Sequence, residues 1–333
     1  MKKIITIAVL AAIAGLLFYF SLKNRQELPI QKKSRFLMDT YCSIQIPGDN
    51  AVLACIDKAF DRVEEIDKKF NIHNPESQIY SFNKNNTPIT DPEIVKLIET
   101  SLLWCERSKG TFDITITPLV RLWGFYGPVP KNPRVPEKSE ILKALEHVGY
   151  RKVIIKNGKV TKTDPAVEID LGGVAKGYAV GQARDILKQL KITSAIIDLG
   201  GAIYALGLNN GKPWKAGIKN PRGDGIFGAF DATEISVGTS GDYERYFEKD
   251  GIRYCHILDP RTGYPARGLI SVSIFTPDTV LADILSKPVF ILGREEGLKF
   301  IENVPGTEAL IISEDGGVSL TPGLKSKLSK KQY

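Results

Sequence analysis

The sequence predicts an α+β fold built largely from antiparallel sheets with helices packed against them. Two observations support this class. Runs rich in β-branched and aromatic residues outnumber the helical segments. Hairpin signals are common, and the clearest is Asn157-Gly158 between two β-branched runs, a dipeptide that favours a two-residue turn. Strands joined by hairpins run antiparallel, so the sheets are expected to be antiparallel as well.

The length and composition indicate a protein that folds and buries a sizeable core. The chain has 333 residues, of which 43% are hydrophobic and 25% charged, enough for one large domain or two closely packed ones. The net charge of +7 is compatible with a nucleic-acid, lipid or phosphorylated partner. Basic residues are spread along the chain and no nucleic-acid motif is present, so we expect no nucleic-acid partner. None of the four cysteines has metal-ligand spacing; we expect buried apolar residues, with a disulfide as the alternative.

The N-terminus carries the most apolar segment. Two lysines precede an uncharged run from Ile4 to Leu22, which as a helix nearly spans a bilayer core. No small-residue cleavage site follows this run. We therefore expect an uncleaved signal anchor at 1–22 and a polar linker at 23–35. Positive charge is nearly balanced across the run, so it gives no firm orientation.

The elements of the body follow in order. Residues 36–46 alternate in part, as a strand does, and residues 51–70 place apolar side chains at helical spacing. A second helix is expected at 92–108, because Pro92 suits a first helical turn and Gly110 suits a helix end.

The next part of the chain, from residue 124 on, contains turn-forming glycine and proline residues. Residues 124–136 are rich in both and predict a loop, and residues 139–146 predict a short helix. A hairpin at 152–162 follows. A strand at 167–171 is then expected to run directly into a helix at 174–190.

The remaining body is rich in strands. Residues 194–199 predict a strand, and the phrase Ile-Asp-Leu-Gly-Gly occurs both at 169–173 and at 197–201, which indicates either two similar lobes or a coincidence. The further expected elements are strands near 213–218, 234–239, 253–258 and 270–275, a helix near 281–292 and a final hairpin near 310–320. The whole body spans 36–325, and a basic tail occupies 326–333.

The first segment that could carry chemistry is the strand, turn and helix from Asp170 to Gly177. A helix N-terminus offers free N–H groups and a positive dipole end, which attract phosphate. Two glycines let a ligand approach the backbone, and Lys176 adds a full positive charge in the first turn. Neither the P-loop nor the dinucleotide fingerprint is present. A tight turn that simply needs two glycines is the alternative.

Two further segments place polar groups beside apolar ones. His256 could act as a general base or hold a phosphate, or it could be an ordinary histidine at a strand end. Arg261 could pair with a carboxylate or a phosphate. Asp283 lies in an apolar helical stretch, as a helix cap, an ion-pair partner or a metal ligand does. Lys287 follows at i+4, so an intrahelical salt bridge is the simplest explanation.

Taken together, the motifs resemble those of the ApbE family of FAD:protein FMN transferases, from about Phe36 to Gly293. Each motif alone is weak, and the ordered set is specific. The matching stretches are Met38-Asp-Thr40, Asn74-Pro-Glu-Ser77 with Asn83, Thr111-Phe-Asp-Ile-Thr115 with Pro118 and Leu122-Trp-Gly-Phe125, Asp170-Leu-Gly-Gly-Val-Ala-Lys-Gly177, Ser240-Gly-Asp-Tyr-Glu-Arg245, His256-Ile-Leu-Asp-Pro-Arg-Thr-Gly263 and Ala282-Asp283.

The resemblance implies an ApbE-like, T-fold-like architecture and a site for FAD. The residues implied to line that site are Met38, His73, Thr111, Phe112, Asp113, Asp170, Lys176 and Ile257. His73 stands where the family often has an aromatic residue, so a stacking role is open to it.

The resemblance also implies a Mg²⁺ ion held by the carbonyl of Gly173 and by Asp283. The third family ligand is a hydroxyl, and this chain has Lys287 in that place. A charged lysine offers no lone pair, so it cannot ligate a metal in that state. Either its ammonium takes the metal position, or Ser286 reaches the metal instead, or activity is weakened.

The implied reaction is phosphoryl transfer. A threonine or serine hydroxyl of an acceptor flavoprotein attacks the phosphorus on the FMN side of FAD, AMP leaves, and His256 or Asp283 takes the proton. The resemblance implies an acceptor in a membrane electron-transfer system and a catalytic domain on the extracytoplasmic (periplasmic) side of the cytoplasmic membrane. An FAD-binding protein without transferase activity, and an FAD pyrophosphatase that gives FMN and AMP, are the alternatives.

Overall fold

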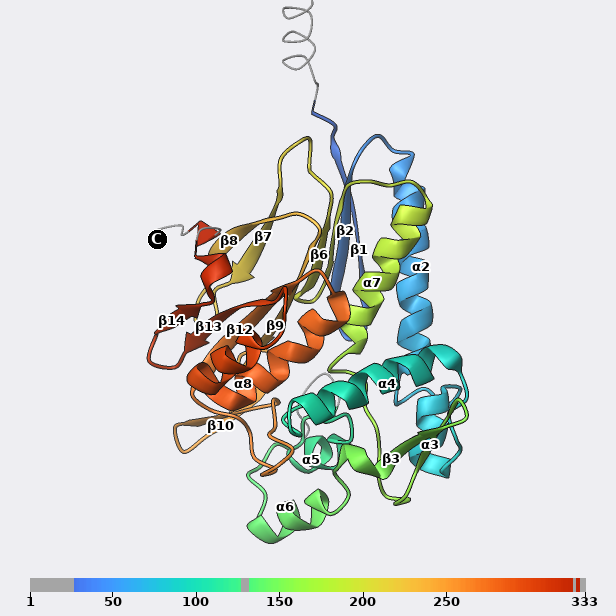
Figure 1. Ribbon diagram of the computed structural model, residues 1–333, viewed down its shortest axis with the longest axis vertical. Coiled ribbons are helices and arrows are strands. Elements are labelled where there is room, and N and C mark those ends of the chain that lie inside the picture. Colours follow the sequence, from blue (N-terminus) through green and yellow to red (C-terminus); the bar gives the residue numbers. More distant parts are fainter. Residues whose placement is uncertain (1–26, 127–131, 326–327, 330–333) are drawn as a thin grey trace, which may run out of the picture.

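The computed structural model describes residues 27–126, 132–325 and 328–329, and it has the predicted α+β fold (Figure 1). Every strand pairing among these residues is antiparallel, which confirms the prediction of largely antiparallel sheets. The predicted anchor at 1–22 and part of the predicted loop at 124–136 lie outside the described residues. In the described ranges no helix has both the length and the apolar character to cross a membrane.

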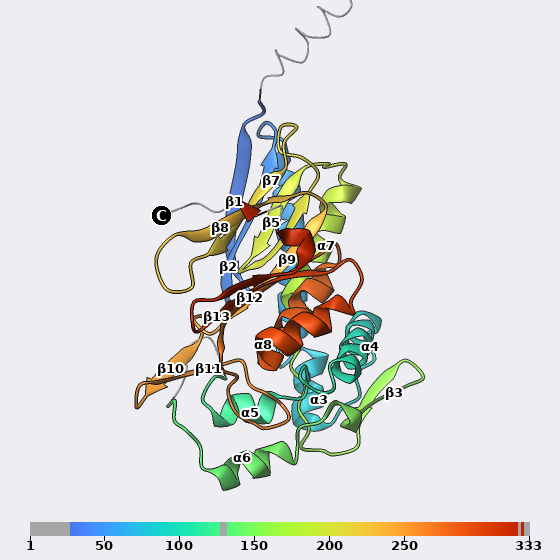
Figure 2. The same cartoon turned by 60° about the vertical axis from the view of Figure 1, so that its left-hand side comes forward.

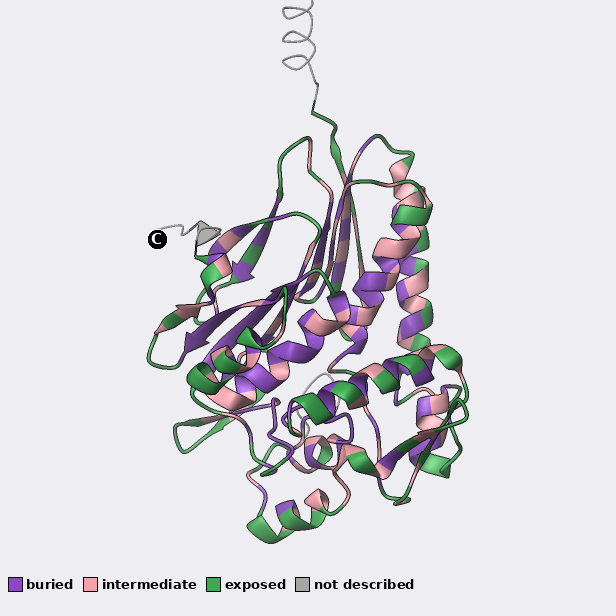
Figure 3. Ribbon diagram, in the orientation of Figure 1, coloured by how far each residue is buried: buried purple, intermediate pink, exposed green. Residues whose placement is uncertain are grey.

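An eight-stranded sheet forms the centre of the molecule, and its order is β1-β2-β5-β6-β9-β12-β13-β14. The central strands are largely buried, as Figure 3 shows, and every residue of β12 is buried. The strands are β1 (Ile30–Leu37), β2 (Thr40–Pro47), β5 (Ala195–Leu199), β6 (Ala202–Leu206), β9 (Ile235–Gly241), β12 (Leu269–Thr276), β13 (Glu308–Ser313) and β14 (Val318–Leu320).

Three helices pack on the large sheet: α2 (Val52–Phe70), α7 (Ala175–Gln189) and α8 (Thr279–Glu302). Figures 1 and 2 both show α7 beside α2 and next to α8. Their buried apolar side chains form one core with those of the sheet, and burial of this apolar surface is the main stabilising contribution. This packing fixes the start of α7 against the first turns of α8, where the candidate site lies.

A second core cluster joins the large sheet to a small one. The small sheet has the order β15-β8-β7, with β7 at Trp214–Lys219, β8 at Ile226–Ala232 and β15 at Leu328–Ser329. Apolar side chains of β7 and β8 pack with those of β9, β12 and β13, and the rings of Phe230 and Phe275 lie 4.6 Å apart. The predicted tail at 326–333 therefore contributes two residues to a strand, and its other residues lie outside the described ranges.

The remaining elements form a region below the sheet in Figure 1. Trp123 is its central core residue: it is fully buried, stacks on Tyr254, and donates from Nε1 to the Gly263 carbonyl (2.8 Å). The elements are α3 (Gln78–Asn85), α4 (Pro92–Arg107), α5 (Thr117–Leu122), α6 (Lys138–Leu145), the hairpins β3 (Val153–Lys156)–β4 (Lys159–Lys162) and β10 (Tyr246–Lys249)–β11 (Ile252–Cys255), and a 3₁₀ turn at Tyr150–Lys152. A second 3₁₀ turn, Pro322–Leu324, lies instead beside β13.

The predicted boundary between linker and body is wrong. Residues 30–35, assigned to the linker, belong to β1, and the single strand predicted at 36–46 is a hairpin whose turn is Met38-Asp39. Both turn residues have positive φ (53° and 59°), as a two-residue hairpin requires. The basic side chains of β1 concealed it, because a charged edge strand has the composition of a linker.

The strand predicted at 167–171 is also wrong, because this extended segment pairs with no neighbouring strand. Side chains and single backbone contacts satisfy its polar groups instead. The Asn83 amide donates to the Ile169 carbonyl (2.8 Å) and accepts from the Ile169 N–H (2.9 Å), and the Asp170 N–H donates to the Ile114 carbonyl (2.8 Å). A buried segment needs such partners whether or not it lies in a sheet.

We expect Asn83→Ala to lower the free energy of unfolding by about 2–4 kcal/mol, because it leaves a buried N–H and a buried carbonyl of Ile169 unpaired. Urea unfolding followed by tryptophan fluorescence measures the change. The control is Asn303→Ala, which removes one exposed amide contact to the Lys299 carbonyl (2.7 Å) and should cost far less. Equal losses in the two variants would contradict the assigned role of Asn83.

Several helices and strands of the structure were not predicted from the sequence. Strands β6, β8 and β10 and helices α3 and α5 were not predicted, and α8 continues past Leu292 to Glu302 across a break at Gly293 (φ 79°). The two copies of Ile-Asp-Leu-Gly-Gly adopt different structures: 169–173 leads into a helix, whereas 197–201 is the end of β5 and its turn into β6. All four cysteines are free, so the disulfide alternative is not realised.

Candidate active site

The start of α7 presents two unpaired backbone donors. The Gly172 N–H donates to Oδ1 of Asp170 (2.7 Å), but the N–H groups of Gly173 and Lys176 bond to no acceptor among the described residues. A Cβ built on Gly173 would lie 3.2 Å from the Phe112 ring and 3.8 Å from Cε of Lys287. The turn thus meets two other predicted site segments, and its free N–H groups point to an anion.

The first turns of α8 face the start of α7. Asp283 is buried, and its Oδ2 accepts from the Gly177 N–H (2.8 Å). Its other oxygen pairs with the Lys287 ammonium, which also donates to the Asp283 carbonyl (2.7 Å). The predicted i,i+4 salt bridge is therefore confirmed, and the turn and Asp283 lie in contact.

The Ser286 hydroxyl is occupied by two hydrogen bonds within the protein. Its hydroxyl is fully buried and bonds to the Ser240 hydroxyl of β9 (2.7 Å) and to the Asp283 carbonyl (2.8 Å). The interpretation in which Ser286 reaches a metal would require both contacts to break. Through its bond to Ser240, Ser286 instead links α8 to strand β9 of the sheet.

His256 follows β11, and the backbone carbonyl of Arg245 fixes the tautomer of its ring. Its own N–H (2.9 Å) and its Nδ1 (3.2 Å) both approach the carbonyl of Arg245. A carbonyl can only accept, so Nδ1 carries the proton in the neutral ring, and the lone pair is on Nε2. The ring is thus prepared to take a proton at Nε2.

Positive charges surround His256. Burial lowers the pKa of His256 to about 3, and the nearby charges of Arg245, Lys176 and Lys287 add to this effect. Lys176 makes no ion pair with any described residue, so its charge is available to a ligand. Burial also lowers the pKa of Arg245, while Asp170 and Asp39 oppose that shift. The turn carrying Met38 and Asp39 therefore faces the same group of charges.

The Thr111–Asp113 segment is held mainly by its own contacts. The Thr111 hydroxyl donates to the Ser108 carbonyl (2.9 Å). Asp113 accepts from the Thr115 N–H and hydroxyl and from the Tyr150 N–H (2.9 Å), and burial raises its pKa. Of these three residues, Phe112 is the one whose ring lies close to the Gly173 turn. Thr111 and Asp113 hold the segment that carries Phe112 in its conformation.

The other predicted residues lie around this centre. Ile257 is buried and its carbonyl accepts from Ala266 (2.8 Å), beside His256 in the chain. The His73 ring is exposed and meets Tyr126 edge-on at 4.6 Å, so its predicted FAD contact stays a prediction. Arg261 pairs with Asp259 through Nε and Nη2 (2.9 and 2.8 Å), so its partner is a carboxylate of the same turn.

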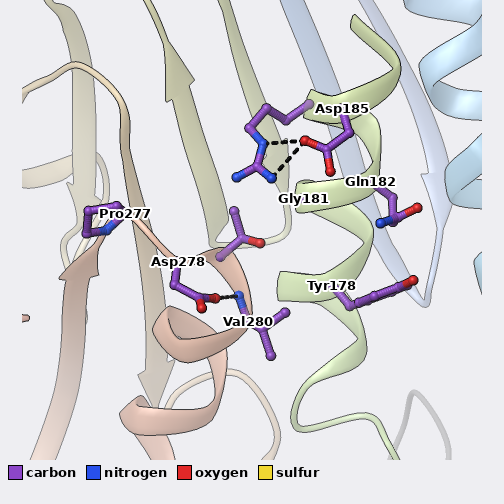
Figure 4. Close-up of a pocket in the computed structure, with 9 residues that line it drawn as sticks. Tyr178, Gly181, Gln182, Asp185, Pro277, Asp278 and Val280 are labelled. Atoms are coloured by element: carbon purple, nitrogen blue, oxygen red, sulfur yellow. Dashed lines mark hydrogen bonds and ion pairs between the residues drawn. The ribbon is translucent and has the colours of Figure 1, made fainter. Parts of the chain in front are cut away.

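A separate pocket of about 370 Å³ opens between α7 and the start of α8 (Figure 4). It contains none of the predicted site residues. Its side chains are engaged: Asp278 caps α8 by accepting from the Val280 N–H (2.9 Å), and Gln182 accepts from Arg62 (3.1 Å). The group of charges around His256, rather than this hollow, is the candidate site.

Comparison with known proteins identifies the family and the fold. A sequence model of the ApbE family matches residues 38–311, which spans every motif assembled above. The chain belongs to the ApbE family. It is 30% identical to an FAD:protein FMN transferase of Haemophilus influenzae over 95% of each chain, and 30% identical to one of Treponema pallidum over 89% of this chain and 88% of that one.

Solved ApbE structures share the fold. The ApbE protein of Thermotoga maritima superimposes with a TM-score of 0.83 at 34% identity, covering 91% of this chain and all of the other. The apo flavinyl transferase ApbE of Pseudomonas stutzeri has a TM-score of 0.80 at 28% identity, covering 91% and 98% of the two chains. The expected ApbE-like architecture is confirmed.

Sequence reasoning missed Arg245 as a site residue of this ApbE protein. Its carbonyl orients His256, and its charge acts on both His256 and Asp170. The signal was available, because Arg245 ends the matched motif that begins at Ser240. An arginine that closes a motif is a candidate for phosphate binding, since its guanidinium suits bidentate contacts.

The donor set of this ApbE member does not fit a divalent cation. Mg²⁺ prefers several oxygen ligands in near-octahedral geometry. Here one Asp283 oxygen is bonded to Gly177 and the other to the Lys287 ammonium, which only donates. The described residues contain no group of three or more His, Cys, Asp or Glu side chains that could hold a metal.

We expect His256→Gln to flatten the fall in stability at acid pH. Unfolded His256 binds a proton near its ordinary pKa of 6.5, whereas the folded ring stays neutral until about pH 3. Below about pH 6.5 the unfolded state thus binds more protons, and the free energy of unfolding falls by up to about 1.4 kcal/mol per pH unit. Urea titrations between about pH 8 and pH 4 measure the slope; parallel curves for the variant and the wild type would contradict the shift.

Proposed function

We propose that this chain transfers FMN from FAD to a threonine or serine hydroxyl of an acceptor flavoprotein and releases AMP. One observation carries the proposal: a neutral His256 with its lone pair on Nε2 is acted on by the charges of three cations, one of which, Lys176, lies in the first turn of α7 where backbone N–H groups are free. This combines a proton acceptor with an anion site, as phosphoryl transfer requires. The curated relatives, which are FAD:protein FMN transferases, support it.

The FAD pyrophosphate would lie against the Gly172-Gly173 turn. The N–H groups of Gly173 and Lys176 would donate to its oxygens, and the Lys176 ammonium would neutralise one charge. The ring of Phe112 borders the same turn and offers an apolar wall. Negative charge in this place would also raise the pKa of His256 toward the range useful for catalysis.

The acceptor hydroxyl would attack the phosphorus on the FMN side. Its oxygen forms a new P–O bond, the bond from that phosphorus to the bridging oxygen breaks, and AMP leaves with the bridging oxygen. The hydroxyl proton passes to Nε2 of His256. Asp283 is the weaker candidate for this role, because Gly177 and Lys287 already engage both of its oxygens.

We infer the cell compartment from the N-terminal sequence and from what the resemblance to the family implies. An anchor at 1–22 would hold the domain at the cytoplasmic membrane on its extracytoplasmic side, where an acceptor of a membrane electron-transfer system is accessible. The observations that support this placement are the uncharged run and the absence of a cleavage site after it.

The test uses the full chain purified in detergent, mixed with FAD and a candidate acceptor flavoprotein. Transfer predicts flavin fluorescence that stays with the denatured acceptor, and AMP in equal amount. Intact bound FAD with no labelled acceptor would mean a binding protein, and free FMN with AMP would mean a pyrophosphatase; either result overturns the proposed transfer. A Thr→Ala or Ser→Ala change at the acceptor hydroxyl is the control and should abolish labelling.

A further inference from the structure

We propose that the Lys287 ammonium is a built-in cation that takes the place of a divalent metal ion, so that this chain handles FAD without metal. The part concerning catalysis rests on the proposed function, whereas the part concerning FAD binding does not. Three observations carry the inference: where Lys287 lies, which of its donors remain free, and how Asp283 is used.

Lys287 lies at the anion site. Its Cε is 3.8 Å from the position that a Cβ on Gly173 would take, directly beside the turn whose N–H groups are free. Its charge also acts on Lys176 and on His256, the two other groups of the site. An ammonium in this place is within reach of a pyrophosphate bound to the turn.

The contacts of Lys287 leave one donor for a ligand. An ammonium has three N–H donors. One bonds to the Asp283 carboxylate and one to the Asp283 carbonyl, so the third is left for an oxygen of the ligand. The side chain is one-fifth exposed, so solvent screens its charge only in part. Asp283 thus positions a cation, as it would position a metal ion.

The same contacts disfavour a metal in this place. A divalent ion beside Asp283 would have to displace the ammonium or lie next to it, at the cost of repulsion between like charges. Asp283 also keeps its second oxygen on the Gly177 N–H, which ties α8 to α7. Both oxygens of the carboxylate therefore already have a partner while Lys287 remains in place.

The experiment compares the full chain with Lys287→Met and Lys287→Thr. Methionine removes the charge and offers no hard ligand, whereas threonine supplies the hydroxyl oxygen that Mg²⁺ prefers. Three quantities are measured with and without EDTA: the Kd for FAD by fluorescence, Mn²⁺ binding by the electron paramagnetic resonance of the free ion, and FMN transfer. Lys299→Met is the matched control, since it removes an exposed lysine of the same helix that pairs with Glu296.

For the wild type we expect EDTA to change the Kd for FAD and the transfer rate by less than about twofold, and Mn²⁺ to stay free in the presence of FAD. Lys287→Met should weaken FAD binding about 10-fold and slow transfer about 100-fold, and added metal should restore neither. Lys287→Thr should bind about one Mn²⁺ per chain with FAD and recover transfer about 10-fold with Mg²⁺. Lys299→Met should match the wild type.

Failure of this inference is distinguishable from failure of the proposed function. If the wild type binds one Mn²⁺ per chain with FAD, and EDTA abolishes transfer, Lys287 is no substitute for a metal although the transferase function stands. If FAD binding is metal-independent and needs Lys287, but no acceptor is labelled, the inference stands and the transferase function fails. A wild type that binds no FAD overturns both.

Discussion

Replacing His256 by glutamine is expected to lower the rate of FMN transfer by about 10²–10⁴-fold, the usual contribution of a positioned general base. Glutamine can still donate an amide N–H to the Arg245 carbonyl, as Nδ1 does at 3.2 Å, but it has no lone pair that takes a proton at neutral pH. The Kd for FAD should change by less than about threefold, because the ring is neutral before FAD binds. Single-turnover labelling of the acceptor measures the rate.

The matched control for this prediction is His147→Gln. His147 pairs with Asp164 (3.0 Å) and has no contact with the group of charges around His256 among the described residues. It should leave the transfer rate within about twofold of the wild type. A His256→Gln variant that keeps a tenth or more of the rate would return the role of base to Asp283, the alternative that the sequence left open.

Local signals predicted much of the fold of this ApbE protein. The hairpin at Asn157-Gly158 forms as expected, because these two residues adopt the positive φ that the turn needs (51° and 68°). Helix α4 begins at Pro92 and ends before Gly110, as the preferences of those residues indicate. Each of these features depends on neighbours in the chain, which is why the sequence alone was sufficient.

The errors share a different cause, because they depend on distant partners. The basic side chains of β1 have distant partners, as when Arg35 pairs with Asp61 of α2 (2.9 Å), and their composition alone does not indicate a strand. The extended segment that ends at Asp170 differs from a strand only because Asn83, 86 residues away from Ile169, supplies its hydrogen bonds. Sequence patterns report the conformation that a segment prefers, whereas the identity of its partner is set by the tertiary fold.

The candidate site divides in the same way. The glycine turn at the start of α7 and the Asp283–Lys287 pair were predictable, because helix N-termini and i,i+4 spacing are local properties. The tautomer of His256 was not predictable, since it depends on the carbonyl of Arg245 across the β10–β11 hairpin. That the start of α7 lies opposite Asp283 of α8 was expected from the family resemblance alone. In the structure, one glycine allows the two helices to approach closely.

That glycine is Gly177, and Gly177→Ala is expected to lower the free energy of unfolding by about 3 kcal/mol and FMN transfer by more than about 100-fold. A Cβ at this position would lie 2.7 Å from Cβ of Asp283 and would overlap the backbone carbonyl of Thr279. Neither neighbour can rotate away, so α7 and α8 must separate. Separation breaks the Gly177 N–H contact to Asp283 (2.8 Å) and moves Lys287 away from the phosphate turn. Urea unfolding and single-turnover labelling measure the two effects.

Gly181→Ala separates this close approach from the general effect of removing a glycine. Gly181 lies one turn later in α7, and a Cβ there would meet the side-chain hydroxyl of Thr279 at 2.6 Å, a group that can change rotamer. Alanine also favours the helix over glycine by about 1 kcal/mol, so Gly181→Ala should be close to neutral in stability and activity. If Gly177→Ala proves equally neutral, contact between the two helices is not what holds the base, the cations and the turn together. A large loss of stability and transfer in Gly177→Ala, but not in Gly181→Ala, would mean that the absence of a side chain at Gly177 lets α7 and α8 come close enough to form the site.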